Sequence, residues 1–411
     1  MDDFGHLTPE DEIFLDEDVL RDEYDPDRIL ERSDKLNEYL KMFKEVVRGK
    51  RPRNVFVYGP TGVGKTVGTK VVLDRLTEDA EEIDQVSVEA VHLECKDLNT
   101  SYQVAANLVN KLRVNTGRST ISTTGYPEGE IYRMLFQELR EADDTHVIIA
   151  LDEIDNIGSD DNILYKLPRC NNTNSAQYVD PEDTKVGVVG ITNDGTFRDR
   201  LDPRAQSTLC DHEIHFPPYD ANELRTILND RAGDAFKPGV LEDDVVPLVA
   251  AFAAQRSGYA RTALELLYAS GKRASDEGAS SVTEEHVRNA ESRLQQGAVV
   301  TEINGLSPQG KLITYTLVLM DDRNELPARM DKLYARYKDM ARRMDVDTIT
   351  PRSVHNILND LMMNGIVTSK EINKGRSGGR HYQYELGTEY DLVAEGLQGD
   401  SDIEDIDDGL L

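Results

Sequence analysis

The stretch VFVYGPTGVGKT, residues 55–66, limits what this chain can fold into more than any other feature of its sequence. An apolar run ends at Gly59, a glycine-rich turn follows, and Lys65 and Thr66 begin a predicted helix, which fits the pattern G-x-x-x-x-G-K-[ST]. In such a turn, backbone N–H groups and the helix N-terminus cradle phosphates, the lysine reaches the β and γ oxygens, and the hydroxyl holds Mg²⁺. An accidental glycine turn is the alternative, and the apolar run before it and the helix after it disfavour that alternative. The sequence therefore predicts binding of ATP or GTP with Mg²⁺ through Pro60, Thr61, Gly62, Val63, Gly64, Lys65, Thr66 and Val67.

The segment VIIALDEIDN, residues 147–156, supplies a partner for the phosphate turn. Its apolar residues predict a buried strand, and Asp152 at the carboxyl end of that strand can reach the magnesium shell. Glu153 follows directly and can orient and deprotonate an attacking water. A solvated acidic turn is the alternative, which the apolar strand in front of the pair disfavours. Because a small-molecule kinase needs no water-activating glutamate, the pair favours hydrolysis over transfer.

Asn193 ends another apolar run, VGVVGITND, at the same predicted edge of the sheet. Its amide could hold the attacking water against the γ phosphate. An ordinary turn asparagine fits the same pattern equally well.

Five apolar runs alternate with helical patterns up to about residue 217, and this alternation predicts a parallel sheet covered by helices on both faces. From the sequence FPPYD to about residue 300, helical patterns alone follow. The predicted strands are residues 54–59, 86–95, 145–155, 185–193 and 210–216.

The predicted organisation has three ordered parts between two acidic ends. Residues 1–25 contain eleven acidic side chains and one arginine, and from residue 395 onward there are seven acids and no base, so we expect disorder at both ends. The predicted parts are an acidic arm (1–22), a nucleotide-binding domain (23–218), a helical domain (219–300), a third domain (307–388) and an acidic tail (389–411).

The formal net charge of −30 normally argues against a nucleic-acid partner, because phosphates repel an acidic surface. Such a charge also fits an acidic coat that keeps a protein soluble in concentrated salt, in which case each face must be judged by its local charge. Cys95, Cys170 and Cys210 lie far apart without zinc spacing, which fits a reducing cytosol. Neither a signal peptide nor a membrane-length apolar run is present in the sequence, so we expect a soluble, cytoplasmic protein with no membrane partner.

The third domain reverses the charge of the chain. From Arg329 to Tyr384 there are eleven basic and six acidic residues, a local net charge of +5, which indicates a polyanion partner. Thr350 and Pro351 predict the start of a helix, and two alternating segments around a turn rich in Gly and Ser predict a β-hairpin. A recognition helix followed by a basic wing is the functional interpretation, and a basic solvated helix and loop is the alternative. The predicted DNA contacts are Arg352, Ser353, His355 and Asn356 on the helix and Lys374, Arg376 and Arg380 on the wing.

The order GPTGVGKT, LDEID, GITND, LDPRAQSTL, FPPYDANEL and SGYARTALELLY resembles AAA+ ATPases. Within them it is similar to the archaeal initiator family related to origin recognition complex subunit 1 and cell division control protein 6, from about residue 22 to about residue 387. The resemblance implies an α/β P-loop AAA+ base domain with a parallel sheet, an all-α lid domain and a C-terminal winged-helix domain. ATP and ADP with Mg²⁺ are the cofactors that it implies.

The resemblance also implies roles that spacing alone does not give. Asn193 matches the first sensor, Arg261 in GYAR matches a lid arginine that contacts the γ phosphate, and Arg204 matches an arginine finger that reaches the nucleotide of a neighbouring subunit. Ordinary surface ion pairs are the alternative for the arginines. Tyr219 and Arg231 resemble further nucleotide contacts at the junction of base and lid.

Two further regions take their roles from the family. Pro26, Ile29 and Leu30 would lie near the adenine, although Glu31 stands before Arg32 where the family commonly has a His-Arg pair. The insertion at residues 159–170 would form a short helix that touches DNA, with Tyr165, Lys166 and Arg169 as candidates.

The expected function is that of a replication initiator with weak ATPase activity. It would bind double-stranded origin DNA and help recruit or load the replicative minichromosome maintenance helicase, with ATP binding and slow hydrolysis as a switch. Paralogous initiators or self-association on DNA are further expected partners. A DNA-bound transcription regulator without helicase loading is the first alternative. A remodelling motor is the last, because no substrate-threading aromatic loop is evident in the sequence.

Overall fold

The computed structural model describes residues 12–24, 26, 28–83, 86–142, 145–158, 160–171, 179–180, 182, 184–373 and 380–397. The chain forms two compact units, Met1–Val287 and Arg288–Leu411. Among the helices in these ranges, none is long and apolar enough to cross a membrane.

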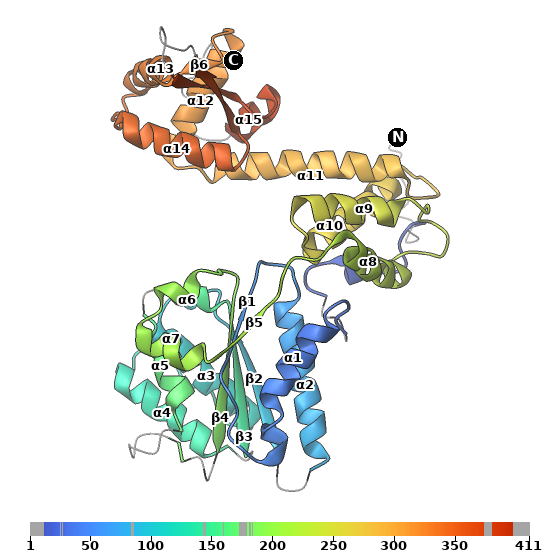
Figure 1. Cartoon of the computed structure of the whole chain (residues 1–411), viewed down its shortest axis with the longest axis vertical. Helices are drawn as coiled ribbons and strands as arrows, with labels where there is room; N and C mark the ends of the chain where they lie inside the picture. The colour runs from blue at the N-terminus through green and yellow to red at the C-terminus, as the bar shows by residue number, and fades with distance from the viewer. Residues whose placement is uncertain are drawn as a thin grey trace, which may run out of the picture. The chain divides into compact units, whose positions relative to one another are not determined.

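The first unit is built on a parallel five-stranded sheet in the order β2-β3-β4-β1-β5 (Figure 1). The whole of β3 is buried, which explains why its sequence is almost continuously apolar. All five strands predicted from the sequence are present in the structure, and each is slightly shorter than its predicted range. The strands are β1 (Val55–Tyr58), β2 (Val88–Glu94), β3 (His146–Asp152), β4 (Lys185–Thr192) and β5 (His212–His215).

Helices cover both faces of this sheet, as the alternating pattern predicts (Figure 1). One face carries α1 (Ser33–Phe43) and α2 (Lys65–Glu81). The other face carries α3 (Ser101–Asn115), α4 (Glu128–Arg140), α5 (Asn162–Lys166), α6 (Phe197–Arg200) and α7 (Pro203–Leu209). Short 3-10 turns join these elements, namely η2 (Val46–Arg48), η3 (Ile154–Ile157) and η4 (Leu167–Arg169).

The lid follows Pro217 and Pro218 and is helical. Its first helix begins with a capping box, in which Asp220 accepts hydrogen bonds from the backbone and Glu223 accepts one from the backbone N–H of Asp220. The lid helices are α8 (Ala221–Ala235), α9 (Val245–Arg256), α10 (Ala260–Asp276) and the start of α11 (Glu284–Asn304).

The acidic arm is partly ordered, so the expectation of disorder over residues 1–22 is wrong for residues 12–22. Phe14 inserts between lid side chains, with its ring centroid 4.9 Å from that of Phe236 and 5.9 Å from that of Tyr268. Backbone hydrogen bonds join residues 13 and 15 to the lid, and a 3-10 turn, η1 (Glu17–Leu20), follows. The arm is mostly acidic, but four of its apolar residues are buried, namely Ile13, Phe14, Val19 and Leu20. Residues 1–11 lie outside the described residues.

The second unit has the helices and antiparallel sheet of a winged helix, with strand order β6-β8-β7. As predicted, the Thr350 hydroxyl accepts a hydrogen bond from the Ser353 N–H, at 3.2 Å, and Pro351 begins the helix. Its elements are α12 (Pro308–Asp322), β6 (Ala328–Arg329), α13 (Met330–Arg343), α14 (Pro351–Met363), β7 (Val367–Asn373), β8 (Arg380–Leu386) and α15 (Tyr390–Leu397).

The tail prediction also needs correction, because residues 390–397 form α15 rather than a disordered segment. Val393 and Leu397 are buried in the core of the second unit. Gly396 lies so close to Ile303 that an added Cβ would come within 2.9 Å of the Ile303 Cβ. Two apolar side chains at helical spacing outweigh the acids around them. Residues 398–411 lie outside the described residues.

Candidate functional site

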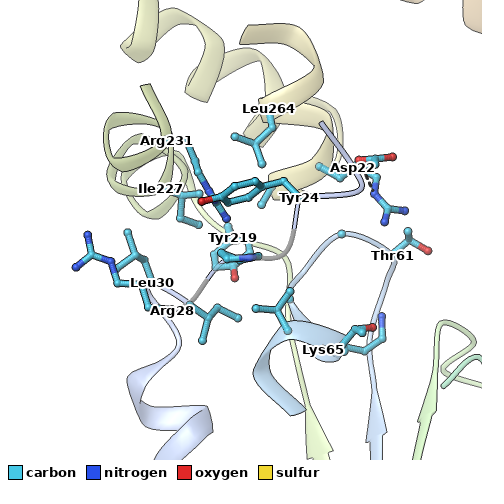
Figure 2. Close-up of a pocket in the computed structure, with 18 of the residues that line it drawn as sticks. Asp22, Tyr24, Arg28, Leu30, Thr61, Lys65, Tyr219, Ile227, Arg231 and Leu264 are labelled. Carbon is cyan, nitrogen blue, oxygen red and sulfur yellow. Dashed lines mark ion pairs between the residues drawn. The ribbon is translucent and has the colours of Figure 1, made fainter. Parts of the chain in front are cut away.

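An open pocket with about 1030 Å³ of empty space lies in the first unit, beyond the carboxyl ends of the strands. Figure 2 shows Tyr24, Ile227, Arg231 and Leu264 on its lid side and Thr61 and Lys65 on its base side. It brings together most of the residues predicted to bind nucleotide: Thr61, Gly62, Gly64, Lys65, Thr66, Val67, Asp152, Glu153, Asn193, Tyr219, Arg231 and Arg261. Pro26, Ile29 and Leu30, expected near an adenine, also line it.

Two residues of the phosphate turn do not line the pocket and act through their carbonyl groups. The Pro60 carbonyl accepts a hydrogen bond from the Lys65 ammonium at 2.6 Å. The Val63 carbonyl accepts one from the buried Arg32 guanidinium at 3.3 Å, and Val63 itself is fully buried.

The glycines of the turn are required by the closeness of neighbouring segments. Gly62 and Gly64 have φ of 74° and 88°, in the left-handed region that glycine tolerates best. A Cβ on Gly64 would lie 2.4 Å from the Ile29 side chain, and one on Gly62 would lie 2.9 Å from the Arg261 Cβ. The Ala260 N–H donates to the Gly62 carbonyl at 2.9 Å. The phosphate turn and the first turn of α10 therefore touch directly.

Lys65 is held at the centre of the site. Its ammonium donates to the Pro60 carbonyl and to Asn193 Oδ1, the latter at 2.7 Å, and the side chain is almost fully buried. Burial lowers the pKa of Lys65 to about 8, although nearby carboxylates oppose that shift. A polyanion bound in the pocket would stabilise the charged form of Lys65.

Asp152 has the surroundings of a magnesium ligand. The Thr66 hydroxyl donates to its Oδ2 at 2.5 Å, and His92 Nε2 lies 3.5 Å from the same oxygen. Burial alone would raise the pKa of Asp152, but the nearby His92 ring and the hydrogen bonds from Thr66 and the Glu153 N–H outweigh burial and hold the pKa below its ordinary value. A hydroxyl beside an ionised carboxylate is an oxygen donor set that suits Mg²⁺.

Glu153 is placed beside Asp152 by an unusual backbone. Its φ of 53° is left-handed, which turns the side chain away from the strand direction. Burial, and then the charge of Asp152, raise the pKa of Glu153. Asn193 Nδ2 lies 3.4 Å from Glu153 Oε1. A carboxylate with a raised pKa is suited to accept a proton near neutral pH.

Asn193 links the two sides of this centre, because its amide contacts both Lys65 and Glu153. The preceding Thr192 hydroxyl donates to Asp155 Oδ1 at 2.6 Å, which fixes the strand end. Asn193 therefore lies between the Lys65 ammonium and the Glu153 carboxylate.

The lid side of the pocket carries the predicted arginines. Arg261 Nε lies 3.0 Å from Asp22 Oδ1 of the arm, and the Arg231 guanidinium carbon lies 4.5 Å from the centre of the Tyr24 ring. The Tyr219 ring is covered by the guanidinium of Arg32, at 3.4 Å.

Arg204 lies apart from this pocket. Its side chain is 71% exposed and pairs with Asp202, at 3.0 Å, and its guanidinium carbon lies 5.2 Å from the Tyr165 ring centre. Arg204 does not line the pocket that gathers the predicted nucleotide-binding residues. Its assignment to a neighbouring subunit stays a prediction.

The DNA candidates lie on several elements. Lys166 covers the Tyr132 ring at 3.8 Å, and Arg169 follows it in η4. On α14, Arg352, His355 and Asn356 are exposed, whereas the Ser353 hydroxyl lies 3.0 Å from that of Thr350 in the helix cap. Lys374 and Arg376 lie outside the described residues, and Arg380 begins β8.

Sequence reasoning missed several residues that line the pocket, and also His92, which lies beside Asp152. His92 lies within an ordinary strand pattern, and no local signal indicates that it faces Asp152. Arg21, Asp22 and Tyr24 belong to the acidic stretch, although the tyrosine among acids was a usable signal. The remaining unpredicted lining residues are Arg28, Ile227, Asp230, Ala260 and Leu264.

The chain matches known families along most of its length. Residues 47–189 match the AAA domain, residues 225–292 match the Cdc6 AAA+ ATPase-type lid domain, and residues 301–396 match the CDC6 C-terminal winged helix domain. The chain is 48% identical to the ORC1-type DNA replication protein 1 of Haloarcula marismortui, over 96% of this chain and 94% of that protein. The chain belongs to the ORC1-type DNA replication protein family.

Other members of the family agree with this assignment. The ORC1-type DNA replication protein of Pyrococcus furiosus is 40% identical, over 91% of this chain and 87% of that protein. The structure of the Aeropyrum pernix ORC1 protein in complex with DNA is similar with a TM-score of 0.76 and 33% identity, over 97% of this chain and all of that one. The predicted fold of base, lid and winged helix is confirmed.

Proposed function

We propose that this ORC1-type protein is an ATP-dependent replication initiator that binds origin duplex DNA and helps recruit the replicative minichromosome maintenance helicase while ATP is bound. One observation carries the proposal. A single chain joins a base-and-lid pocket lined by Lys65, Asp152 and Glu153 to a winged helix with an exposed polar helix face. A pocket without the second unit would suit many ATPases, and a winged helix without the pocket would suit a simple repressor.

The pocket residues fit ATP with Mg²⁺. The P-loop N–H groups and Lys65 would hold the phosphates, and Thr66 and Asp152 would hold the ion, which supplies charge neutralisation at the phosphates. Glu153 would orient a water and accept its proton, and Asn193 would hold that water in line. Since Asn193 also contacts Lys65, loss of the terminal phosphate would change the surroundings of both side chains.

The lid would read the state of the nucleotide. Arg261 stands at the start of α10, directly beside Gly62 of the phosphate turn. A terminal phosphate would attract this arginine and draw α10 towards the turn, and hydrolysis would release it. Slow hydrolysis would then switch the initiator off. Arg204, exposed on α7, would contact the nucleotide of a paralogue or of a second copy on DNA.

DNA would be bound by the winged helix and by the insertion that contains α5. Arg352, His355 and Asn356 are exposed on α14 and carry the donor and acceptor groups that read base edges. Tyr165, Lys166 and Arg169 would add contacts from the base. The similar Aeropyrum pernix protein was solved in complex with DNA, which supports this part of the proposal.

Chromatin immunoprecipitation tests the proposal against its rival. Enrichment at one or a few intergenic sites, lost in an Arg352→Ala variant, is expected of an initiator. Enrichment at many promoters with a matching change in their transcripts would instead establish a DNA-bound regulator. Co-purification of the helicase with the Glu153→Gln protein in ATP, and its absence in ADP, would test the recruiting step.

A further inference from the structure

A hollow on the base domain gathers arginines that the nucleotide site does not use. It lies before β1, at the opposite end of that strand from the P-loop, and has about 910 Å³ of space open to solvent. The lining residues are Arg51, Pro52, Arg53, Asn54, Pro168, Arg169, Ser207, Thr208 and Asp211.

A run of basic residues in the sequence leads into this hollow. Residues 48–53, RGKRPR, contain four basic side chains in six positions of a chain that has 77 acidic and 47 basic residues. The basic side chains of this run fall into two groups that have different neighbours. Arg48 and Lys50 both pair with Glu45, at 2.8 Å and 2.6 Å, whereas Arg51 and Arg53 line the hollow.

The three arginines of the hollow lack carboxylate partners. Arg51 donates to the Pro168 carbonyl at 3.2 Å, Arg53 contacts His212 Nε2 at 2.6 Å, and the Arg169 guanidinium carbon lies 5.1 Å from the Tyr165 ring centre. Within the part of the chain that the structure describes, none of the three forms an ion pair. Asp211 is the single acid of the lining, and it faces His212 at 3.4 Å. Most guanidinium donors of the hollow are therefore available to an anion.

The backbone beneath the arginines is fixed. Pro52 is buried so closely against β4 that a Cβ on Gly187 would lie 2.7 Å from the Pro52 Cβ. The Asn54 amide donates to the carbonyls of Pro168 and Thr208, at 3.3 Å and 3.2 Å, and accepts from the Val188 N–H. Asn54 thus joins the basic run, η4 and α7, so that the arginines are presented together at little cost in backbone ordering.

We propose that this hollow binds a backbone phosphate of duplex DNA and extends the DNA contact of the insertion across the base domain. Arg169 belongs both to the insertion and to the hollow, which makes the two surfaces continuous. Guanidinium groups bind phosphate with two parallel hydrogen bonds and are weakly hydrated. In salt near 1 M, where the Debye length is about 3 Å, contacts of this kind persist while long-range attraction fades. The inference rests on the proposed DNA-binding function.

The test compares two double variants of the full chain in binding to origin duplex. Arg51→Ala with Arg53→Ala removes two arginines of the hollow, and Arg48→Ala with Lys50→Ala removes the same charge from the same run outside it. We expect the first pair to weaken binding about tenfold and to lower the slope of log affinity against log salt by about 1 to 2, since each lost phosphate contact contributes about 0.9. The control pair should change affinity less than twofold. ATP binding should be normal in both, because the P-loop is at the other end of β1.

Hydroxyl-radical footprinting separates this inference from the proposed function. Loss of protection at one flank in the hollow variant, with the centre retained, supports the inference. Equal affinity losses in both pairs, or a complete footprint in the hollow variant, would overturn it and leave origin binding intact. If Arg352→Ala leaves the centre of the footprint protected, the recognition-helix assignment fails, while the comparison of the two pairs still decides whether the hollow binds duplex.

Discussion

Replacing Glu153 with Gln should stop hydrolysis while ATP stays bound. Glu153 is the carboxylate next to Asp152 with a raised pKa. Among the described residues, its side chain makes only long hydrogen bonds, at 3.4 Å with Asn193 and 3.5 Å with Asn156. The substitution therefore removes a proton acceptor and few bonds. Loss of a positioned general base lowers a rate by about 10² to 10⁴-fold. Affinity for ATP should be unchanged or higher, because one negative charge leaves a site that must accept a polyanion.

The pH dependence of the wild-type protein follows from the same geometry. A base acts only when ionised, and burial raises the pKa of Glu153, so the hydrolysis rate should fall as pH drops through a value above the ordinary glutamate range. Glu94→Gln is a matched control, since Glu94 is an exposed neighbour whose charge also raises the pKa of Glu153. This control should keep hydrolysis and move the acidic limb to lower pH. Single-turnover and multiple-turnover phosphate release measure both effects, and multiple turnover at the wild-type rate by Glu153→Gln would refute the assignment.

Three further substitutions and one change of salt concentration probe other parts of the molecule. Lys65→Ala should abolish ATP binding in equilibrium dialysis, and near-normal affinity would contradict the assigned P-loop role. Asp22→Asn should raise ATP affinity by a factor of roughly 2 to 5, because the exposed ion pair between Asp22 and Arg261 is worth about 1 kcal/mol or less. An unchanged ratio of ATP to ADP affinity would show that Asp22 does not compete with the terminal phosphate for Arg261. Phe14→Ala should cost about 3 kcal/mol of arm docking on the lid, seen as faster proteolysis of the arm, and equal proteolysis would show that the ring contributes little. Duplex affinity should also fall less between moderate and high potassium chloride than for a basic relative, and a steep loss in filter binding would contradict that expectation.

Local patterns were sufficient for the sheet and for the centre of the nucleotide site. A buried strand such as β3 has to be apolar throughout, and the residue that follows such a strand lies at the sheet edge where ligands bind. Asp152 and Asn193 were found for this reason, and Lys65 was found from the spacing of the phosphate-binding motif. Lys65 donates a hydrogen bond to Asn193, and Asp152 and Asn193 both contact Glu153. The cap of α14 was found because it depends on four consecutive residues.

The residues that local patterns did not reveal are placed by contacts between segments that are distant in the sequence. Phe14 meets Phe236 more than 200 positions away, and nothing near residue 14 indicates a partner. His92 reaches Asp152 only because β2 and β3 are neighbours in the sheet, with Glu94 opposite Asp152. Composition misled at both ends of the chain, since a few apolar side chains at the right spacing are enough to dock an otherwise acidic segment.

The ordered arm bears directly on the role proposed for Arg261 of the lid. Arg261 already has an anionic partner, Asp22, on a segment that is tied to the lid by Phe14 and to the pocket by Tyr24. In the proposed switch, a terminal phosphate would have to displace this carboxylate before it could engage Arg261, because two anions beside one arginine would repel each other. ADP, which lacks that phosphate, would leave the Arg261–Asp22 pair intact. Under the proposed function, the free energy by which Arg261 distinguishes ATP from ADP would then be the difference between two ion pairs. A small difference of this kind would suit a switch that has to reverse.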